Sequence, residues 1–117
     1  MAPSDAHGRF LQLRAIARGS REAATARVRD AFQDAGAFIT DVHFFSGVQT
    51  VLQFEVDAER VAALHRALEG AGVELDASGA AALERARFAT GELQGTIAVT
   101  FADGDPDLTH EIPSVPG

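Results

Sequence analysis

His43 is the residue whose chemistry best suits acid–base catalysis, because histidine titrates near neutral pH. Alternation of apolar and polar residues places it on the same strand face as Asp41, with Arg14 and Glu55 on the matching faces of other predicted strands. A carboxylate beside His43 would orient the imidazole as a general base. The alternative is a surface or interface histidine that bonds a carboxylate, because no nucleophile or metal motif accompanies it. His43 and Arg14 are therefore the catalytic candidates, while the sequence as a whole favours a protein that is not an enzyme.

A second candidate site is the turn formed by Arg18, Gly19 and Ser20, which precedes a predicted helix. Backbone N–H groups at a helix N-terminus attract carboxylate or phosphate groups, and Arg18 and Arg21 add positive charge. We name Arg18, Gly19 and Ser20 as the ligand-binding candidates, for a small anion. The alternative is purely structural, because any capped helix after a tight turn carries residues of these types.

Neither a metal nor a cofactor is expected from the sequence. The acidic run at 103–107 is similar to a calcium loop, but Leu108 and Ser114 stand where that loop needs Gly and Glu. His7 and His65 form no metal-ligand spacing with another histidine, and the chain contains no cysteine. Residues 103–107 are therefore predicted to be turn and tail residues.

Hydrophobic periodicity predicts the elements that would position these residues. Apolar and polar residues alternate in three predicted strands, of which the last two form a hairpin: 10–18, 38–45 and 50–56. Three helices are predicted to follow the capping residues Ser20, Asp57 and Ser78. The first two have apolar residues at helical spacing, and the third is rich in strong helix formers. The third of these helices spans residues 78–89. Residues 73–76 and 95–102 are further strands, and periodicity does not decide which of them is the last strand of the sandwich.

The length and composition of the chain are those of one domain. Its 117 residues and 46% hydrophobic content suit a single core. We predict that residues 9–102 form a single α+β sandwich domain, with a disordered leader at 1–8 and an extended C-terminal tail at 103–117. The net charge of −7 disfavours nucleic-acid binding, and no apolar stretch is long enough for a signal peptide or a membrane span. We expect a cytoplasmic protein.

The predicted order of elements defines an α+β fold. It is a ferredoxin-like βαββαβ two-layer sandwich, an antiparallel sheet with helices on one face, plus a C-terminal helix and strand. Residues 9–76 resemble the ACT-type regulatory domains in three places: Arg18-Gly19-Ser20 after the first strand, Gly36-Ala37-Phe38-Ile39 before the second, and the strand at 50–56 that runs directly into the helix at Asp57. The resemblance implies a homodimer that binds a small ligand such as an amino acid at its interface.

The second face of the sheet has no helix to cover it in such a sandwich. It is predicted to collect apolar and polar side chains together: Phe10, Ile16, Ile39, Phe45 and Val51 beside Gln12, Arg14, Asp41, His43, Gln53 and Glu55. A mixed face of this kind is typical of an interface, and we expect a homodimer, unless the third helix or the tail covers the face. Three functions stay open: an ACT-like small-molecule-binding or regulatory module, a dimeric α/β barrel enzyme or binding protein with a cavity over the open sheet face, and a structural or interaction domain without ligand.

Overall fold

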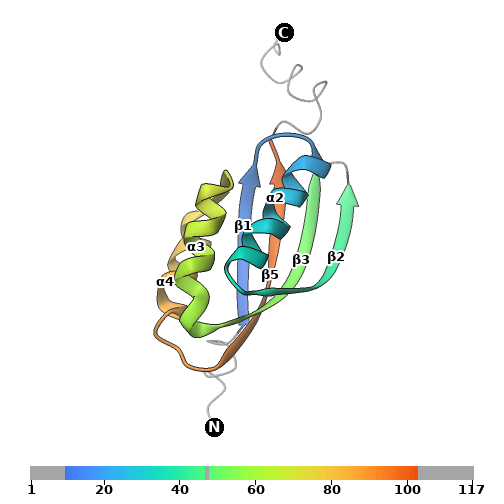
Figure 1. The fold of residues 1–117 in the computed structure, drawn as a ribbon. Coiled ribbons are helices and arrows are strands. Elements are labelled where there is room, and N and C mark those ends of the chain that lie inside the picture. The colour runs from blue at the N-terminus through green and yellow to red at the C-terminus, as the bar shows by residue number, and fades with distance from the viewer. Residues whose placement is uncertain (1–9, 47, 103–117) are drawn as a thin grey trace.

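The first strand has the alternating burial that its sequence predicts. In the computed structural model, β1 (Phe10–Ala17) buries every second residue from Leu11 onward and exposes those between. The structure describes residues 10–46 and 48–102, so the predicted leader at 1–8 and tail at 103–117 lie outside the described residues. The other elements follow in this order: α2 (Arg21–Asp34), β2 (Phe38–Ser46), β3 (Gln49–Asp57), the 3-10 helix η1 (Ala58–Arg60), α3 (Val61–Gly70), β4 (Val73–Leu75), α4 (Ala77–Ala86) and β5 (Glu92–Phe101) (Figure 1).

The strands form one mixed sheet in the order β2-β3-β5-β1-β4. β5 runs parallel to β1 and antiparallel to β3, and the other neighbouring strands are antiparallel. The prediction of an antiparallel sheet is therefore wrong, because β5 enters between β1 and β3. Residues 73–75 form the short strand β4 at the outer edge of β1. The fold is thus a two-layer α+β fold with a mixed five-stranded sheet and three α-helices among the described residues.

β5 fits the middle of the sheet because one of its faces is apolar and its backbone can approach both neighbours closely. Gly95 lies opposite Leu11 of β1 and Phe54 of β3. A Cβ atom at Gly95 would lie 2.8 Å from Phe54 Cζ and closer still to the Leu11 carbonyl oxygen. Only glycine lets the three strands meet at this point. Four other β5 side chains are buried in the core: Leu93, Ile97, Val99 and Phe101.

The first two helices start near the predicted residues, although their caps differ. The Ser20 hydroxyl accepts a hydrogen bond from the N–H of Ala23 at 3.2 Å, so Ser20 caps α2 as predicted. Gly36 follows α2 with a φ of +80°, a conformation that favours glycine. Asp57 precedes the single turn η1 and makes no side-chain cap bond, and α3 begins only at Val61.

The third helix, α4, is capped by Asp76, whose Oδ1 accepts a hydrogen bond from the N–H of Gly79 at 2.7 Å. The prediction that Ser78 caps this helix is wrong, because Ser78 already lies inside α4. The N–H of Asp76 also donates to the Arg14 carbonyl at 3.0 Å. α4 therefore continues the line of β4 and packs against the part of the β1 edge that β4 leaves free, and against α3.

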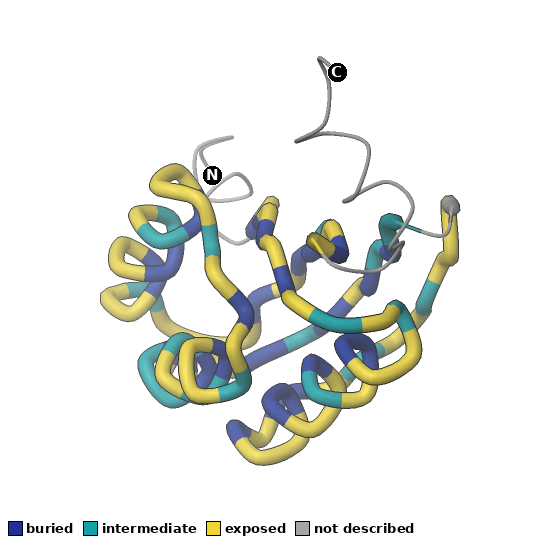
Figure 2. Tube along the Cα trace, turned by 90° about the horizontal axis from the view of Figure 1, so that it is seen from above, coloured by how far each residue is buried: buried dark blue, intermediate teal, exposed yellow. Residues whose placement is uncertain are grey.

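The helices cover one face and one edge of the sheet. Figure 2 shows the helical turns below and to the left of the sheet. The Phe32 ring on α2 packs against the Phe54 ring on β3, with centroids 4.9 Å apart, and both side chains are fully buried. Among the described residues, no helix has the length and apolar character needed to cross a membrane.

Candidate functional site

We call the sheet face opposite α2 and α3 the open face. The strand register orders its side chains in rows across β2, β3, β5 and β1: Phe38, Glu55, Gln94 and Phe10; Asp41, Gln53, Thr96 and Gln12; His43, Val51, Ala98 and Arg14; and Gln49, Thr100 and Ile16, with Glu74 on β4. All of these residues are exposed or half-buried. The third helix does not cover this face, because α4 packs at the β1 edge.

Irregular pairing in β2 changes which side chains reach the open face. The register of β2 shifts between Ile39 and Asp41 and again between Phe44 and Ser46. A bulge moves the following residues to the opposite face. Ile39 therefore lies opposite the buried Phe54 on the helix side, and its predicted place on the open face is wrong. Phe45 falls in the second shift and has no paired residue on β3.

Large apolar side chains occupy the corners of the open face rather than its middle. Phe38 and Phe10 end the first row and Ile16 lies at the far end of β1, with exposed fractions of 68%, 45% and 51%. The middle of the face carries smaller side chains, including Thr96 and Ala98. A second flat surface laid on this face would touch the corners first and leave space over the middle.

His43 and Asp41 form an exposed pair on β2. His43 Nε2 lies 2.9 Å from Asp41 Oδ2, and the two side chains are 54% and 51% exposed. The other carboxylate oxygen, Oδ1, accepts a hydrogen bond from the N–H of Val42 at 2.9 Å. The carboxylate is thus fixed at both oxygens and sets the direction of the imidazole. An exposed pair of this kind contributes about 0–1 kcal/mol to stability.

Arg14 does not join this pair within one chain. It shares a row with His43, but Val51 and Ala98 stand between them. Three strand spacings separate the two positions, roughly 14 Å. One chain therefore does not bring His43 and Arg14 to the same substrate atom, and Glu55 lies two rows away from His43.

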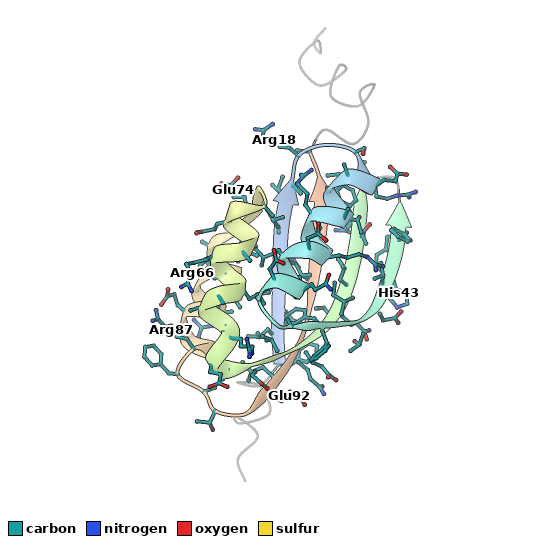
Figure 3. All side chains as sticks on the ribbon, viewed as in Figure 1. Arg18, His43, Arg66, Glu74, Arg87 and Glu92 are labelled. Carbon is teal, nitrogen blue, oxygen red and sulfur yellow. The ribbon has the colours of Figure 1, made fainter. Side chains whose placement is uncertain are left out.

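Arg18, Gly19 and Ser20 lie in the turn between β1 and α2, and Figure 3 shows Arg18 well apart from His43. Gly19 has a φ of +100°, which favours glycine. The Ser20 hydroxyl is engaged as the helix cap. The arrangement leaves Arg18 exposed at the end of the sheet, and its role as a ligand contact stays a prediction.

Arg27 holds this turn and was not singled out from the sequence. Its Nε donates to the Ala71 carbonyl at 2.9 Å, and its Nη2 donates to the Arg18 carbonyl. Arg27 therefore ties the β1–α2 turn to the α3–β4 turn. The periodicity of α2 shows only that Arg27 lies off the apolar stripe, because its partner Ala71 is 44 residues away.

A hollow of about 290 Å³ between α3 and α4 gathers charged side chains from both helices. Figure 3 shows Arg66 and Arg87 on this side of the molecule. Acids accompany the bases: His65 Nε2 lies 3.6 Å from Glu69 Oε2, and Arg87 Nη1 lies 3.3 Å from Glu84 Oε1. The hollow is therefore nearly balanced in charge. Only the packing of α3 against α4 creates this hollow, so His65 was the one residue of it that sequence reasoning considered.

Metal binding finds no support within residues 10–46 and 48–102, where no three histidine, aspartate or glutamate side chains are grouped to hold an ion. The acidic run at 103–107 lies outside the described residues.

The described residues form an α+β fold in which helices cover one face of the sheet and leave the open face uncovered. A comparison with protein-family models, curated proteins and solved structures finds no significant match for the chain. No family match supports the ACT-type resemblance in particular. The resemblance rests on the order of elements from β1 to β4 and on the residues quoted for it in the sequence analysis.

Proposed function

We propose that the protein is a homodimeric small-molecule-binding protein of the dimeric α/β barrel type, in which two open faces stack and enclose the ligand. The observation that carries the proposal is the distribution of side chains on the open face, with Phe38, Phe10 and Ile16 at its corners and Thr96 and Ala98 in its middle. Stacked sheets lie about 10 Å apart, and larger corner residues then serve as the contacts around a polar space.

The area of the open face is sufficient for a specific dimer. Four strands about 4.8 Å apart, with four rows of side chains spaced two residues apart at a rise of about 3.3 Å per residue, span roughly 500 Å² per copy. Two copies then bury roughly 1,000 Å² in total, which is the lower limit for a specific interface. We expect a reversible dimer rather than an obligate one.

Symmetry gives the charged residues of the open face a role in the dimer. A two-fold axis parallel to the strands, between β3 and β5, places β1 of one copy over β2 of the other. Arg14 of each copy then comes opposite the Asp41–His43 pair of its neighbour. Opposite charges that meet in this way fix the register of the dimer. A small anion in the enclosed space would meet Arg14 and the polar side chains of Gln53 and Thr96.

The dimer is tested by the variant Ile16→Arg, with Ala81→Arg as its matched control. Ile16 lies on the open face and is 51% exposed, whereas Ala81 is an exposed residue of α4. Both variants should fold, because neither side chain is in the core. In sedimentation equilibrium we expect dimers for the parent and Ala81→Arg and a monomer for Ile16→Arg. A monomeric parent protein would refute pairing, and a dimeric Ile16→Arg variant would move the contact to strand edges or helices, as in an ACT-like dimer.

The predicted charge pairing and the ligand each have a separate test. Arg14→Asp should weaken the dimer, and Asp41→Arg added to it should restore the dimer. A thermal-shift screen over amino acids and small anions addresses the ligand, because a ligand at 100 times its Kd adds about 2.7 kcal/mol of stability. A screen without any shift would favour a dimer or interaction domain that binds no such molecule.

A further inference from the structure

The outer edge of β2 carries backbone groups that no strand bonds among the described residues, because β2 is the first strand in the order of the sheet. Beside it, the N–H of Phe101 donates to the Val48 carbonyl at 2.9 Å where β3 meets β5. At the other end of the same pair of strands, the N–H of Ala58 donates to the Gly91 carbonyl at 2.9 Å. Both bonds continue the register of the β3–β5 ladder at even-numbered residues on the β3 side. Even-numbered residues of β3 therefore bond to β5 and odd-numbered ones to β2, because bonded pairs alternate in an antiparallel ladder.

The same alternation shows which groups β2 presents to its outer edge. A β2 residue opposite an even-numbered residue of β3 makes no bond to β3, so its N–H and C=O groups point outward. Val42 is such a residue, because it lies opposite Leu52. Two other β2 residues also lie opposite even-numbered residues of β3. The outward-pointing set on β2 is therefore Ile39, Val42 and Phe44.

Asp41 occupies the central group of this set. The N–H of Val42 donates to Asp41 Oδ1 at 2.9 Å, and Asp41 Oδ2 lies 2.9 Å from His43 Nε2. A strand laid against β2 could bond the Val42 N–H only by displacing this carboxylate, whose negative charge also repels an incoming carbonyl oxygen. The register shifts that follow Ile39 and Phe44 interrupt the edge on either side of Val42. The Asp41 carboxylate therefore blocks the regular stretch between the two shifts.

The composition of β2 makes such a block necessary. Its nine residues include a single carboxylate, that of Asp41. Phe38, Phe44 and Phe45 of the same strand are 68%, 57% and 67% exposed. An exposed edge strand rich in apolar and β-branched residues pairs with other chains unless charges, bulges or prolines interrupt it. Asp41 is therefore the residue whose removal most exposes this edge to a second chain.

We propose that the Asp41 carboxylate is an autoinhibitory contact that prevents β2 from pairing with β2 of a second copy of this chain. The pairing that it prevents is antiparallel and centred on Val42. There a two-fold axis lets the outward N–H of each Val42 meet the outward C=O of the other. A second copy is the fitting partner because the same groups then serve both sides of the contact. The autoinhibitory contact lies at the edge of the sheet and does not depend on pairing of the open face.

Sedimentation velocity of the full-length chain tests this contact, in variants that all carry Ile16→Arg so that the open faces do not pair. The variant Ile16→Arg/Asp41→Ala should associate with increasing concentration to at least twice the mass of Ile16→Arg. The matched control Ile16→Arg/Asp30→Ala loses the same charge from an exposed residue of α2 and should keep the mass of Ile16→Arg. Both should fold, because neither acid is buried. Equal masses of the Asp41→Ala and Asp30→Ala variants would overturn the proposal.

Two further variants tie the association to the Val42 amide. Asp41→Asn keeps an oxygen that can accept from Val42, so Ile16→Arg/Asp41→Asn should keep the mass of Ile16→Arg. Val42→Pro removes an N–H that points outward and takes no part in the β3 ladder, which an edge strand tolerates. Added to Ile16→Arg/Asp41→Ala, it should abolish association and leave far-UV circular dichroism unchanged. Association that survives Val42→Pro, or that is as strong with Asp41→Asn as with Asp41→Ala, would contradict the proposal.

Hydrogen exchange at low protein concentration measures the contact itself. Loss of one hydrogen bond corresponds to a roughly two- to tenfold change, so Asp41→Ala should speed exchange of the Val42 amide by that factor in the Ile16→Arg background. Asp30→Ala should leave the exchange rate of Val42 unchanged. An equal rate at Val42 in the two variants would show that Asp41 does not hold this amide, and would overturn the proposal.

Failure of the open-face dimer gives a different result from failure of the autoinhibitory contact. An Ile16→Arg protein that still dimerises would refute the open-face pairing. If Val42→Pro then dissociates that dimer, β2 edges pair despite Asp41 and the autoinhibitory contact is refuted as well. A dimer that survives Val42→Pro is formed by another surface and agrees with a blocked β2 edge.

Discussion

Gly95 gives the sharpest test of the sheet, because its substitution by alanine should destabilise the protein by about 2–3 kcal/mol. The added Cβ would lie 2.8 Å from Phe54 Cζ and 2.8 Å from Leu11 Cβ, closer than real Cβ contacts. Phe54 is 1% exposed and the Leu11 carbonyl belongs to the sheet backbone, so neither can move aside cheaply. Overpacking of this kind costs about 1–3 kcal/mol, and occasionally more. We expect an overpacking cost near the upper end of this range. Alanine lowers the conformational entropy of the unfolded chain, which offsets about 0.4–1 kcal/mol of that cost.

Gly70→Ala is the matched control, since a Cβ atom at Gly70 would meet nothing within 4 Å. Gly70 ends α3, where alanine should stabilise the helix by up to about 1 kcal/mol. The chain has neither Trp nor Tyr, so urea unfolding should be followed by far-UV circular dichroism. In thermal unfolding, Gly95→Ala should lower Tm by roughly 8–12 °C. A Gly95→Ala variant as stable as the parent would refute the close approach of β1, β5 and β3.

Three further substitutions test single contacts by urea unfolding. Arg27→Met should lower the free energy of unfolding by about 1–3 kcal/mol, because it leaves two carbonyl groups without their donor. An unchanged free energy of unfolding would show that the β1–α2 and α3–β4 turns do not need Arg27. Asp76→Ala should cost about 1 kcal/mol and Ser78→Ala less than about 0.5 kcal/mol, whereas equal losses would contradict Asp76 as the cap of α4. Thr50→Val should add about 1 kcal/mol, because the buried Thr50 hydroxyl has no hydrogen-bond partner among the described residues; a loss of stability would reveal a partner.

Local features of the fold could be predicted, whereas long-range ones could not. Ser20 was identified as a cap because its hydroxyl acts on an N–H three residues away, and β1 was identified because alternation is a property of neighbouring residues. The place of β5 between β1 and β3 depends on pairing with residues at least 35 positions away. Gly95 was the available signal, since a glycine inside a strand often marks a close backbone approach.

The candidate site was predicted in the same uneven way. Arg14, Asp41 and His43 were correctly assigned to one face, and Asp41 lies at hydrogen-bond distance from His43. The separation of Arg14 from His43 follows from the strand order, which alternation does not contain. Ile39 was misplaced because counting every second residue cannot detect a bulge, and the contribution of Arg27 depends on a turn that lies far along the chain.

The place of β5 also limits when this protein can fold during its synthesis. While residues 92–101 are still inside the ribosome, β1 and β3 lack their native neighbour, although every earlier helix and strand has been made. β1 and β3 run antiparallel, so a nascent chain can join them directly, and that premature sheet must open before β5 enters. Closure of the sheet is therefore a late, long-range step, of the kind that slows folding and prolongs exposure to aggregation.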